Sequence, residues 1–245
     1  YRYALQAGAA LNYRSLGTVE FLLDLQSEPH FIEINPRIQV EHPVTEMVTG
    51  IDLVQAQLRL ASGQPLSFKQ EQVMQRGAAI EVRVLAEDPE QGFLPASGDI
   101  ALLELPQGPG VRVDAALSPG MPVSANYDSL LAKVIVWAED RTSALRRMRR
   151  ALDEFQLGGV PTDLDFLKRV VESPRFVAGK IDTTYLDSFQ PVLPEGARVL
   201  EQDAALAAAL LAHHARAARR QAGNVENGAL SGWRAAAWRE QMSGQ

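Results

Sequence analysis

The chain has 245 residues, of which 46% are hydrophobic and 22% charged, and its 24 basic and 30 acidic residues give a net charge of −6. This length allows one large domain or two smaller ones, each with a buried core. The excess of acidic residues argues against a protein that binds nucleic acids in general or binds peripherally to anionic membranes. The absence of cysteine excludes disulfides, a thiol nucleophile and a cysteine-ligated zinc site, and it suits a cytoplasmic protein.

The chain begins at Tyr1, inside a pattern that predicts a helix over residues 2–11, and no N-cap residue precedes it. No charged segment followed by an apolar one marks a secretion signal, and no run of about 18 apolar residues predicts a membrane span. We therefore expect this sequence to be a piece of a longer polypeptide.

The first part of the chain is predicted to form a helix, a β-hairpin and a second helix. After helix 2–11, the expected strand, turn, strand and helix lie at 18–25, 26–29, 30–35 and 53–61. Pro36 cannot donate to a strand ladder, so we expect regular pairing to weaken there.

The next part is predicted to be an α+β unit. A β-branched run at 77–84 and closely spaced turn signals indicate an antiparallel sheet, which a strand at 130–137 extends. Helix 140–155 is predicted from one apolar stripe, formed by Leu145, Met148, Leu152 and Phe155. A further helix, 162–172, is expected to be capped by Thr162 or Asp163. The predicted division is into 1–65, 77–190 and an Ala-rich helical linker or docking tail at 195–245.

The hairpin carries the pattern that points to chemistry. A turn centred between Gln26 and Ser27 places Glu20 opposite Glu33, and Asn35 lies on the same face as Glu33. Two opposed carboxylates repel unless one is protonated or a cation lies between them. Carboxylate and amide oxygens suit Mg²⁺ or Mn²⁺. The alternative is a solvent-facing strand pair with scattered glutamates.

The odd-numbered positions that follow Asn35 are also polar, namely Arg37, Gln39 and Glu41. If the ribbon stays extended past Pro36, these residues continue the same face. An arginine beside metal-binding carboxylates can hold a small anion, and a nearby glutamate can act as a base on it. The alternative is an amphipathic surface strand.

Residues 31–46, FIEINPRIQVEHPVTE, resemble the signature of biotin carboxylases, the ATP-grasp ligases of acetyl-, propionyl- and methylcrotonyl-CoA carboxylases and pyruvate carboxylases. Further similar runs are GTVEF at 17–21, MVTGIDL at 47–53, IEVRVLAEDP at 80–89, FLPASG at 93–98 and YDSLLAK at 127–133. The resemblance covers roughly residues 1–190. It implies an α+β fold, in which the second half of an ATP-grasp core, an antiparallel sheet with helices, precedes the biotin carboxylase C-terminal domain.

The resemblance also implies how the hairpin binds its ligands. Glu20, Glu33 and Asn35 would coordinate the Mg²⁺ or Mn²⁺ that is bound to ATP, so Glu20 and Glu33 would contact the nucleotide through the metal. Arg37, Gln39 and the Val40 backbone would hold bicarbonate. In this family such a site serves the first half-reaction of an acyl-CoA carboxylase.

The catalytic steps implied by the resemblance begin with Glu41, which would deprotonate bicarbonate for attack on the γ-phosphate of ATP. The resulting carboxyphosphate would decompose to CO₂ and phosphate, and the phosphate would take the proton from the ureido nitrogen of biotin. Arg37 and Arg83 would then stabilise the biotin enolate that captures CO₂. From the residues alone, Arg83 could instead pair with Glu81 on the same strand face.

The resemblance implies that biotin arrives on a carrier domain outside this chain and that a carboxyltransferase subunit is a further partner, in a homo- or hetero-oligomer. We find no glycine-rich ATP lid and no Met-Lys-Met biotinylation motif. We therefore expect the chain alone not to turn over ATP. Two alternatives stay open: another ATP-grasp ligase of the carbamoyl-phosphate synthase type, and a non-catalytic assembly subunit.

Overall fold

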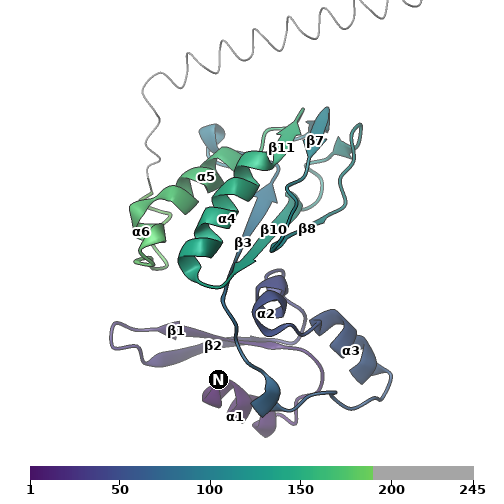
Figure 1. The fold of residues 1–245 in the computed structure, drawn as a ribbon, viewed down its shortest axis with the longest axis vertical. Coiled ribbons are helices and arrows are strands. Elements are labelled where there is room, and N and C mark those ends of the chain that lie inside the picture. The colour runs from purple at the N-terminus through teal and green to yellow at the C-terminus, as the bar shows by residue number, and fades with distance from the viewer. Residues whose placement is uncertain (190–245) are drawn as a thin grey trace, which may run out of the picture. The chain divides into compact units, whose positions relative to one another are not determined.

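The computed structural model describes residues 1–189, which form an α+β structure (Figure 1). The predicted tail at 195–245 lies outside the described residues. Within residues 1–189, no helix is long and apolar enough to cross a membrane.

The N-terminal part contains helix α1 (Arg2–Ala10) and an antiparallel hairpin of β1 (Thr18–Leu23) and β2 (Pro29–Asn35). The hairpin differs from the prediction because β1 ends before Asp24. The Asp24 carboxylate accepts hydrogen bonds from the backbone N–H groups of Gln26 and Glu28, both at 2.9 Å, and so begins the turn two residues earlier than expected.

The register of the hairpin is nevertheless the predicted one at the acidic pair. Leu23 pairs with Pro29, which centres the turn on Gln26 rather than between Gln26 and Ser27. A bulge then shifts the register by one residue between the pairs Phe21–Phe31 and Glu20–Glu33. The two departures cancel, so Glu20 faces Glu33.

The polar series does not continue as an extended ribbon, so the condition for a single polar face through Glu41 is not met. Strand β2 ends at Asn35, as Pro36 led us to expect, and helix α2 (His42–Thr49) follows after six residues. Helix α2 was not predicted, although Pro43 in its first turn and Gly50 just after it, with φ of 73°, are the residues that favour helix ends.

Helix α3 (Leu53–Ala61) is confirmed at its predicted bounds. The Asp52 side chain caps it by accepting from the Gln55 N–H at 2.7 Å.

The second part is built on an antiparallel sheet in the order β3 (Ala78–Leu85), β10 (Leu130–Ala138) and β8 (Val111–Ala115). Helices α4 (Arg141–Glu154) and α5 (Leu164–Glu172) cover one face of this sheet, and Figure 1 shows α4 lying along β3 and β10. The predicted stripe of α4 is confirmed, since all four of its residues are buried. The sheet contributes seven buried residues to the hydrophobic core, namely Ile80, Val82, Val84, Ala132, Val134, Val136 and Ala138.

Short elements complete this part. Three two-stranded pairs are formed by β4 (Glu87–Asp88) with β5 (Leu94–Pro95), β6 (Gly98–Asp99) with β9 (Pro122–Val123), and β7 (Leu102–Glu104) with β11 (Gln156–Gly158). The remaining helical turns are η1 (Gln70–Gln72), η2 (Pro89–Gln91) and α6 (Pro174–Val177). The face of the main sheet opposite α4 contacts helix α2, which brings the segment after β2 onto the sheet.

Asp163 precedes α5, but its side chain does not cap the helix as predicted. Its Oδ1 instead accepts from the Leu85 N–H at 2.8 Å, and its own N–H donates to the Leu85 carbonyl at 3.2 Å. Asp163 therefore ties the start of α5 to the end of β3. The residue is 4% exposed, and burial raises the pKa of its carboxyl group to about 6.

We predict that Asp163→Asn stabilises the fold at high pH. Folded Asp163 keeps its proton up to about pH 6, whereas the unfolded chain releases it near 3.8, so the free energy of unfolding falls as pH rises through this window. The asparagine keeps the acceptor for Leu85 without the buried charge. Urea unfolding should show a gain of about 2 kcal/mol at pH 8 that vanishes near pH 4.

The control for this prediction is Asp165→Asn, two residues further on in the first turn of α5, because that side chain is 77% exposed. It should change stability little at either pH. A gain for Asp163→Asn that is equal at both pH values would contradict the assignment of the effect to a buried charge.

Candidate active site

Glu20 and Glu33 face each other across the hairpin, and Asn35 binds both of them. The Asn35 Nδ2 donates to Glu20 Oε1 at 2.7 Å and to Glu33 Oε1 at 2.8 Å. The predicted pairing is confirmed, and an amide group lies between the two like charges. Among the described contacts, the second oxygen of each carboxylate accepts no hydrogen bond.

This donor set fits part of a hard-cation site. Two carboxylates and one amide supply oxygen ligands, and Mg²⁺ ordinarily completes its shell with water or phosphate oxygens. Over residues 1–189, no group of three or more histidine, cysteine, aspartate and glutamate side chains is arranged to hold a metal ion. The hairpin therefore suits a cation that brings further ligands with it, as a nucleotide-bound metal does.

Arg37 and Gln39 join the same cluster from the segment after β2. The Arg37 Nη1 donates to Gln39 Oε1 at 2.7 Å, and the Gln39 Nε2 donates to Glu20 Oε1 at 3.0 Å. The Arg37 Nη2 lies 3.5 Å from Asn35 Oδ1. Although the ribbon is not extended here, side-chain hydrogen bonds connect the predicted group of Glu20, Glu33, Asn35, Arg37 and Gln39.

Glu41 lies in a second group, with Arg83 of β3. The Arg83 Nη2 is 2.9 Å from Glu41 Oε2, and the two side chains are 48% and 54% exposed. No hydrogen bond or ion pair of the described residues joins Glu41 to Arg37. The structure thus pairs two of the predicted site residues that are 42 positions apart in the sequence.

The alternative pairing of Arg83 with Glu81 is not found. The Glu81 Oε2 is buried and has no hydrogen-bond partner among the described residues. Burial raises the pKa of Glu81 to about 7, although the positive charges of Lys133 and Arg83 oppose this shift. A carboxyl group that titrates near neutral pH therefore lies beside the Glu41–Arg83 pair.

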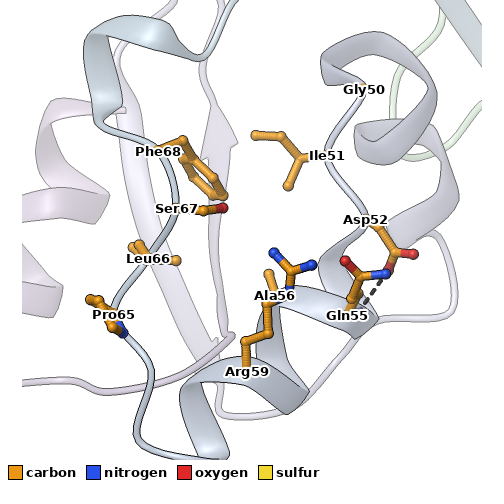
Figure 2. Close-up of a pocket in the computed structure, with 10 residues that line it drawn as sticks. All are labelled: Gly50, Ile51, Asp52, Gln55, Ala56, Arg59, Pro65, Leu66, Ser67 and Phe68. Carbon is orange, nitrogen blue, oxygen red and sulfur yellow. Dashed lines mark hydrogen bonds between the residues drawn. The ribbon is translucent and has the colours of Figure 1, made fainter.

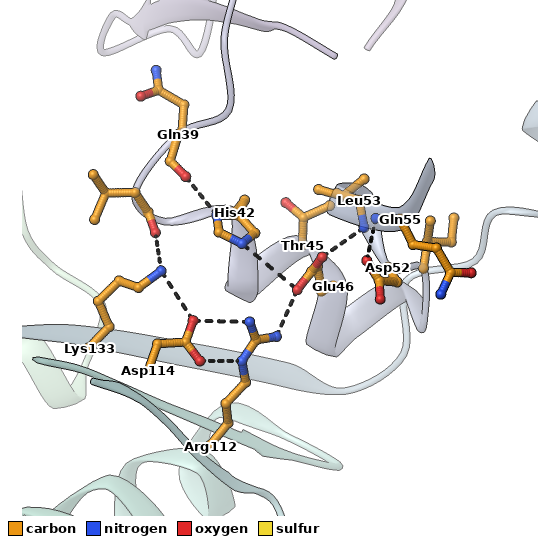
Figure 3. A network of polar contacts seen from close by, with 12 residues as sticks. Gln39, His42, Thr45, Glu46, Asp52, Leu53, Gln55, Arg112, Asp114 and Lys133 are labelled. Atoms are coloured by element: carbon orange, nitrogen blue, oxygen red, sulfur yellow. Dashed lines mark hydrogen bonds and ion pairs between the residues drawn. The ribbon is translucent and has the colours of Figure 1, made fainter. Parts of the chain in front are cut away.

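Val40 is held through its carbonyl oxygen, which accepts a hydrogen bond from Lys133 Nζ at 3.0 Å. Lys133 in turn lies 3.2 Å from Asp114, and Arg112 binds Asp114 through two nitrogens at 2.7 and 3.0 Å. Burial raises the pKa of Asp114, but hydrogen bonds from Arg112 and Lys133 outweigh it and hold the pKa below its usual value. Figure 3 shows this network.

The network continues from Arg112 into helix α2. The Arg112 Nη1 donates to Glu46 Oε2 at 2.7 Å, and Glu46 Oε1 accepts from the Leu53 N–H at the start of α3, also at 2.7 Å (Figure 3). Sequence reasoning assigned no role to Arg112, Asp114, Lys133 or Glu46. The two-residue spacing of Arg112 and Asp114 places both on one face of a strand, but their partners are 66 and 19 residues away.

A cavity of about 270 Å³ lies apart from these residues, between α3 and residues 65–68 (Figure 2). Its polar lining comes from Asp52, Gln55, Arg59 and Ser67. Its larger apolar groups are Ile51, Leu66 and Phe68. None of the predicted site residues lines it.

Two family models match the chain. Residues 1–69 match the ATP-binding domain of the carbamoyl-phosphate synthase L chain, and residues 81–188 match the biotin carboxylase C-terminal domain. Among curated proteins, a biotin carboxylase of Nostoc sp. is 48% identical over 183 residues, which are 75% of this chain and 41% of that protein. The alpha chain of human mitochondrial propionyl-CoA carboxylase is 45% identical over 190 residues, 77% of this chain and 26% of that one.

Solved structures agree with these matches. The biotin carboxylase domain of the 2-oxoglutarate carboxylase of Hydrogenobacter thermophilus, a dimer in complex with MgADP, ADP and bicarbonate, has a TM-score of 0.75 and 44% identity. The match covers 76% of this chain and 41% of that one. A biotin carboxylase of Campylobacter jejuni with a β-γ-ATP ligand has a TM-score of 0.74 and 40% identity. That match covers 77% of this chain and 42% of the other. The chain spans about two fifths of the length of the Nostoc and Bacillus biotin carboxylases that it matches.

We predict that two Glu→Gln substitutions near α2 differ sharply in their effect on stability. Glu46 is 10% exposed and accepts from both Arg112 and Leu53, so Glu46→Gln should lower the free energy of unfolding by about 2 kcal/mol. Glu41 is largely exposed, and Glu41→Gln should change it by less than about 0.5 kcal/mol. Urea unfolding of the two variants measures both values, and equal effects would show that the Arg112–Glu46 contact is not what fixes α2.

Proposed function

Because this chain belongs to the biotin carboxylase family, we propose that it supplies the metal-, bicarbonate- and biotin-binding residues for the ATP-dependent carboxylation of biotin. The observation that carries this proposal is the hydrogen-bonded cluster of two opposed carboxylates, Glu20 and Glu33, with Asn35, Gln39 and Arg37. It combines oxygen ligands for a cation with a guanidinium group for an anion.

Glu20, Glu33 and Asn35 hold the metal in this proposal. When bound, the Mg²⁺ or Mn²⁺ ion offsets the charge of the ATP phosphates during phosphoryl transfer. The Asn35 amide now donates to both carboxylates, so it stands where a cation would relieve their repulsion. The rest of the nucleotide site lies outside the residues assigned here.

Arg37, Gln39 and the Val40 N–H hold bicarbonate, and Glu41 accepts its proton. The freed oxygen attacks the γ-phosphorus of ATP while the bond to the bridging oxygen of ADP breaks, which forms carboxyphosphate. Arg83 orients the Glu41 carboxylate at 2.9 Å and, together with Arg37, offers positive charge where the biotin ureido group becomes negative.

The partners in this proposal are a biotinylated carrier domain and a carboxyltransferase, which selects the acyl-CoA. The division into residues 1–65, 77–190 and a docking tail at 195–245 belongs to the same proposal. The match of residues 81–188 to the biotin carboxylase C-terminal domain favours this function over a carbamoyl-phosphate synthase, whose ATP-binding domain matches residues 1–69 alone.

The metal assignment predicts that Glu20→Gln and Glu33→Gln each weaken Mn²⁺ binding by about tenfold, because each removes one of two carboxylate ligands. Electron paramagnetic resonance of free Mn²⁺ in a titration with the 245-residue chain measures the affinity. Glu28→Gln is the matched control, since Glu28 is exposed in the turn of the same hairpin. Unchanged Mn²⁺ affinity in both site variants would contradict a metal site at Glu20 and Glu33.

The catalytic assignment predicts that Glu41→Gln lowers biotin-dependent carboxylation by about 100-fold or more while the fold stays intact. The assay is phosphate release from MgATP, dependent on bicarbonate and biotin, by the native polypeptide that contains these residues. Glu71→Gln, in the exposed turn η1, is the control. Full activity of Glu41→Gln would contradict the proposed function.

A further inference from the structure

Two consecutive peptide groups at the proposed bicarbonate site are held by their carbonyl oxygens. The Gln39 carbonyl accepts from His42 Nδ1 at 2.7 Å and from the His42 backbone N–H at 3.3 Å. The Val40 carbonyl accepts from Lys133 Nζ at 3.0 Å. Both contacts come from outside the two peptides themselves, one from helix α2 and one from strand β10.

Fixing these carbonyls also fixes the amide groups that share their planes. In a trans peptide the C=O and the next N–H are coplanar and point in opposite directions. The Gln39 carbonyl therefore sets the direction of the Val40 N–H, and the Val40 carbonyl sets that of the Glu41 N–H. Neither N–H donates to a protein group among the contacts of the described residues.

Lys133 is itself held in place by the sheet. Arg83, Lys133 and Asp114 are register partners across β3, β10 and β8, so their side chains leave the same face in a row. The Lys133 side chain is only 12% exposed, and its ammonium group lies 3.2 Å from Asp114. Two charged members of this row thus contact consecutive residues. Arg83 pairs with the Glu41 side chain, and Lys133 donates to the Val40 carbonyl.

We infer that Lys133 and His42 are positioning residues, which orient the Val40 and Glu41 peptide groups so that bicarbonate meets the Val40 N–H beside the Glu41 carboxylate. This inference rests on the function proposed above. His42 acts here as a donor through its Nδ1 proton, and its Nε2 lies 4.0 Å from Glu46. Neither residue touches bicarbonate; both act through the backbone.

The expected signature is a change in the use of bicarbonate rather than of ATP. Lys133→Met keeps the length of the side chain and leaves Asp114 paired with Arg112, but it frees the Val40–Glu41 peptide. A misplacement of about 1 Å at a reacting group can cost about 100-fold in rate. We expect KM for bicarbonate to rise about tenfold or more and KM for ATP to change less than about twofold, because the proposed metal ligands lie on β1 and β2.

The experiment compares steady-state kinetics of variants in the native polypeptide that contains these residues. Lys133→Met and His42→Ala should both raise KM for bicarbonate. His42→Asn should restore it to within about threefold of the parent value, because the asparagine Nδ2 can donate to the Gln39 carbonyl as Nδ1 does. Lys168→Met, on α5 away from the site, is the matched control.

The outcomes separate this inference from the function on which it rests. Full activity of Glu41→Gln overturns the proposed function and the positioning role together. Loss of activity in Glu41→Gln with normal KM for bicarbonate in both Lys133→Met and His42→Ala overturns the positioning role alone. If Lys133→Met does not fold, the pair His42→Ala and His42→Asn decides, and equal KM values for bicarbonate in that pair overturn the inference.

Discussion

The row of Arg83, Lys133 and Asp114 across the main sheet is the interaction on which the arrangement of the site depends. Strand β2 ends at Asn35, and the six residues after it have no ladder to fix them. Contacts from this row fix two of these six residues. Arg83 binds the Glu41 side chain, and Lys133 donates a hydrogen bond to the Val40 carbonyl. A sheet from the second part of the chain thereby sets the geometry of a loop from the first part.

The two faces of that sheet have opposite roles. One face packs its alternate valine, isoleucine and alanine residues against α4 and α5 and supplies most of the hydrophobic burial. The other carries charged side chains that pair with one another or with α2 and the segment before it, as Asp114 pairs with Arg112 and Lys133. Glu81 is the exception on this face, because one of its oxygens is buried without a hydrogen-bond partner among residues 1–189 and its pKa is raised to about 7. Charge pairing therefore connects α2 to the sheet on a face where Ile135 of β10 and Pro43 of α2 are also fully buried.

The hairpin of β1 and β2 places two like charges opposite each other. Glu20 and Glu33 are forced to face each other by the strand register, which places like charges where they destabilise a strand pair. The Asn35 amide donates to both and relieves part of that cost. Such a cluster has capacity for a cation, because two carboxylate oxygens remain without hydrogen bonds in the described part of the chain. The arrangement agrees with a site that is completed by ligands from elsewhere.

The sequence by itself determined the α+β class, helix α3 at its bounds, the apolar stripe of α4 and the pairing of Glu20 with Glu33. The first three of these features follow from local periodicity, capping residues and alternation, which a single segment carries. It also identified the family, through the run at 31–46. The pairing was obtained only because an early turn and a bulge, both unforeseen, cancel at that position.

Only the tertiary structure decided the rest. It replaced the extended ribbon with six irregular residues that lead into helix α2. It also moved Asp163 from a cap to a contact with Leu85, and it paired Arg83 with Glu41 instead of Glu81. It also revealed Lys133, whose partner Val40 lies 93 residues away. These contacts join segments distant in sequence, and no local pattern encodes them, because they arise only when tertiary packing brings their elements together.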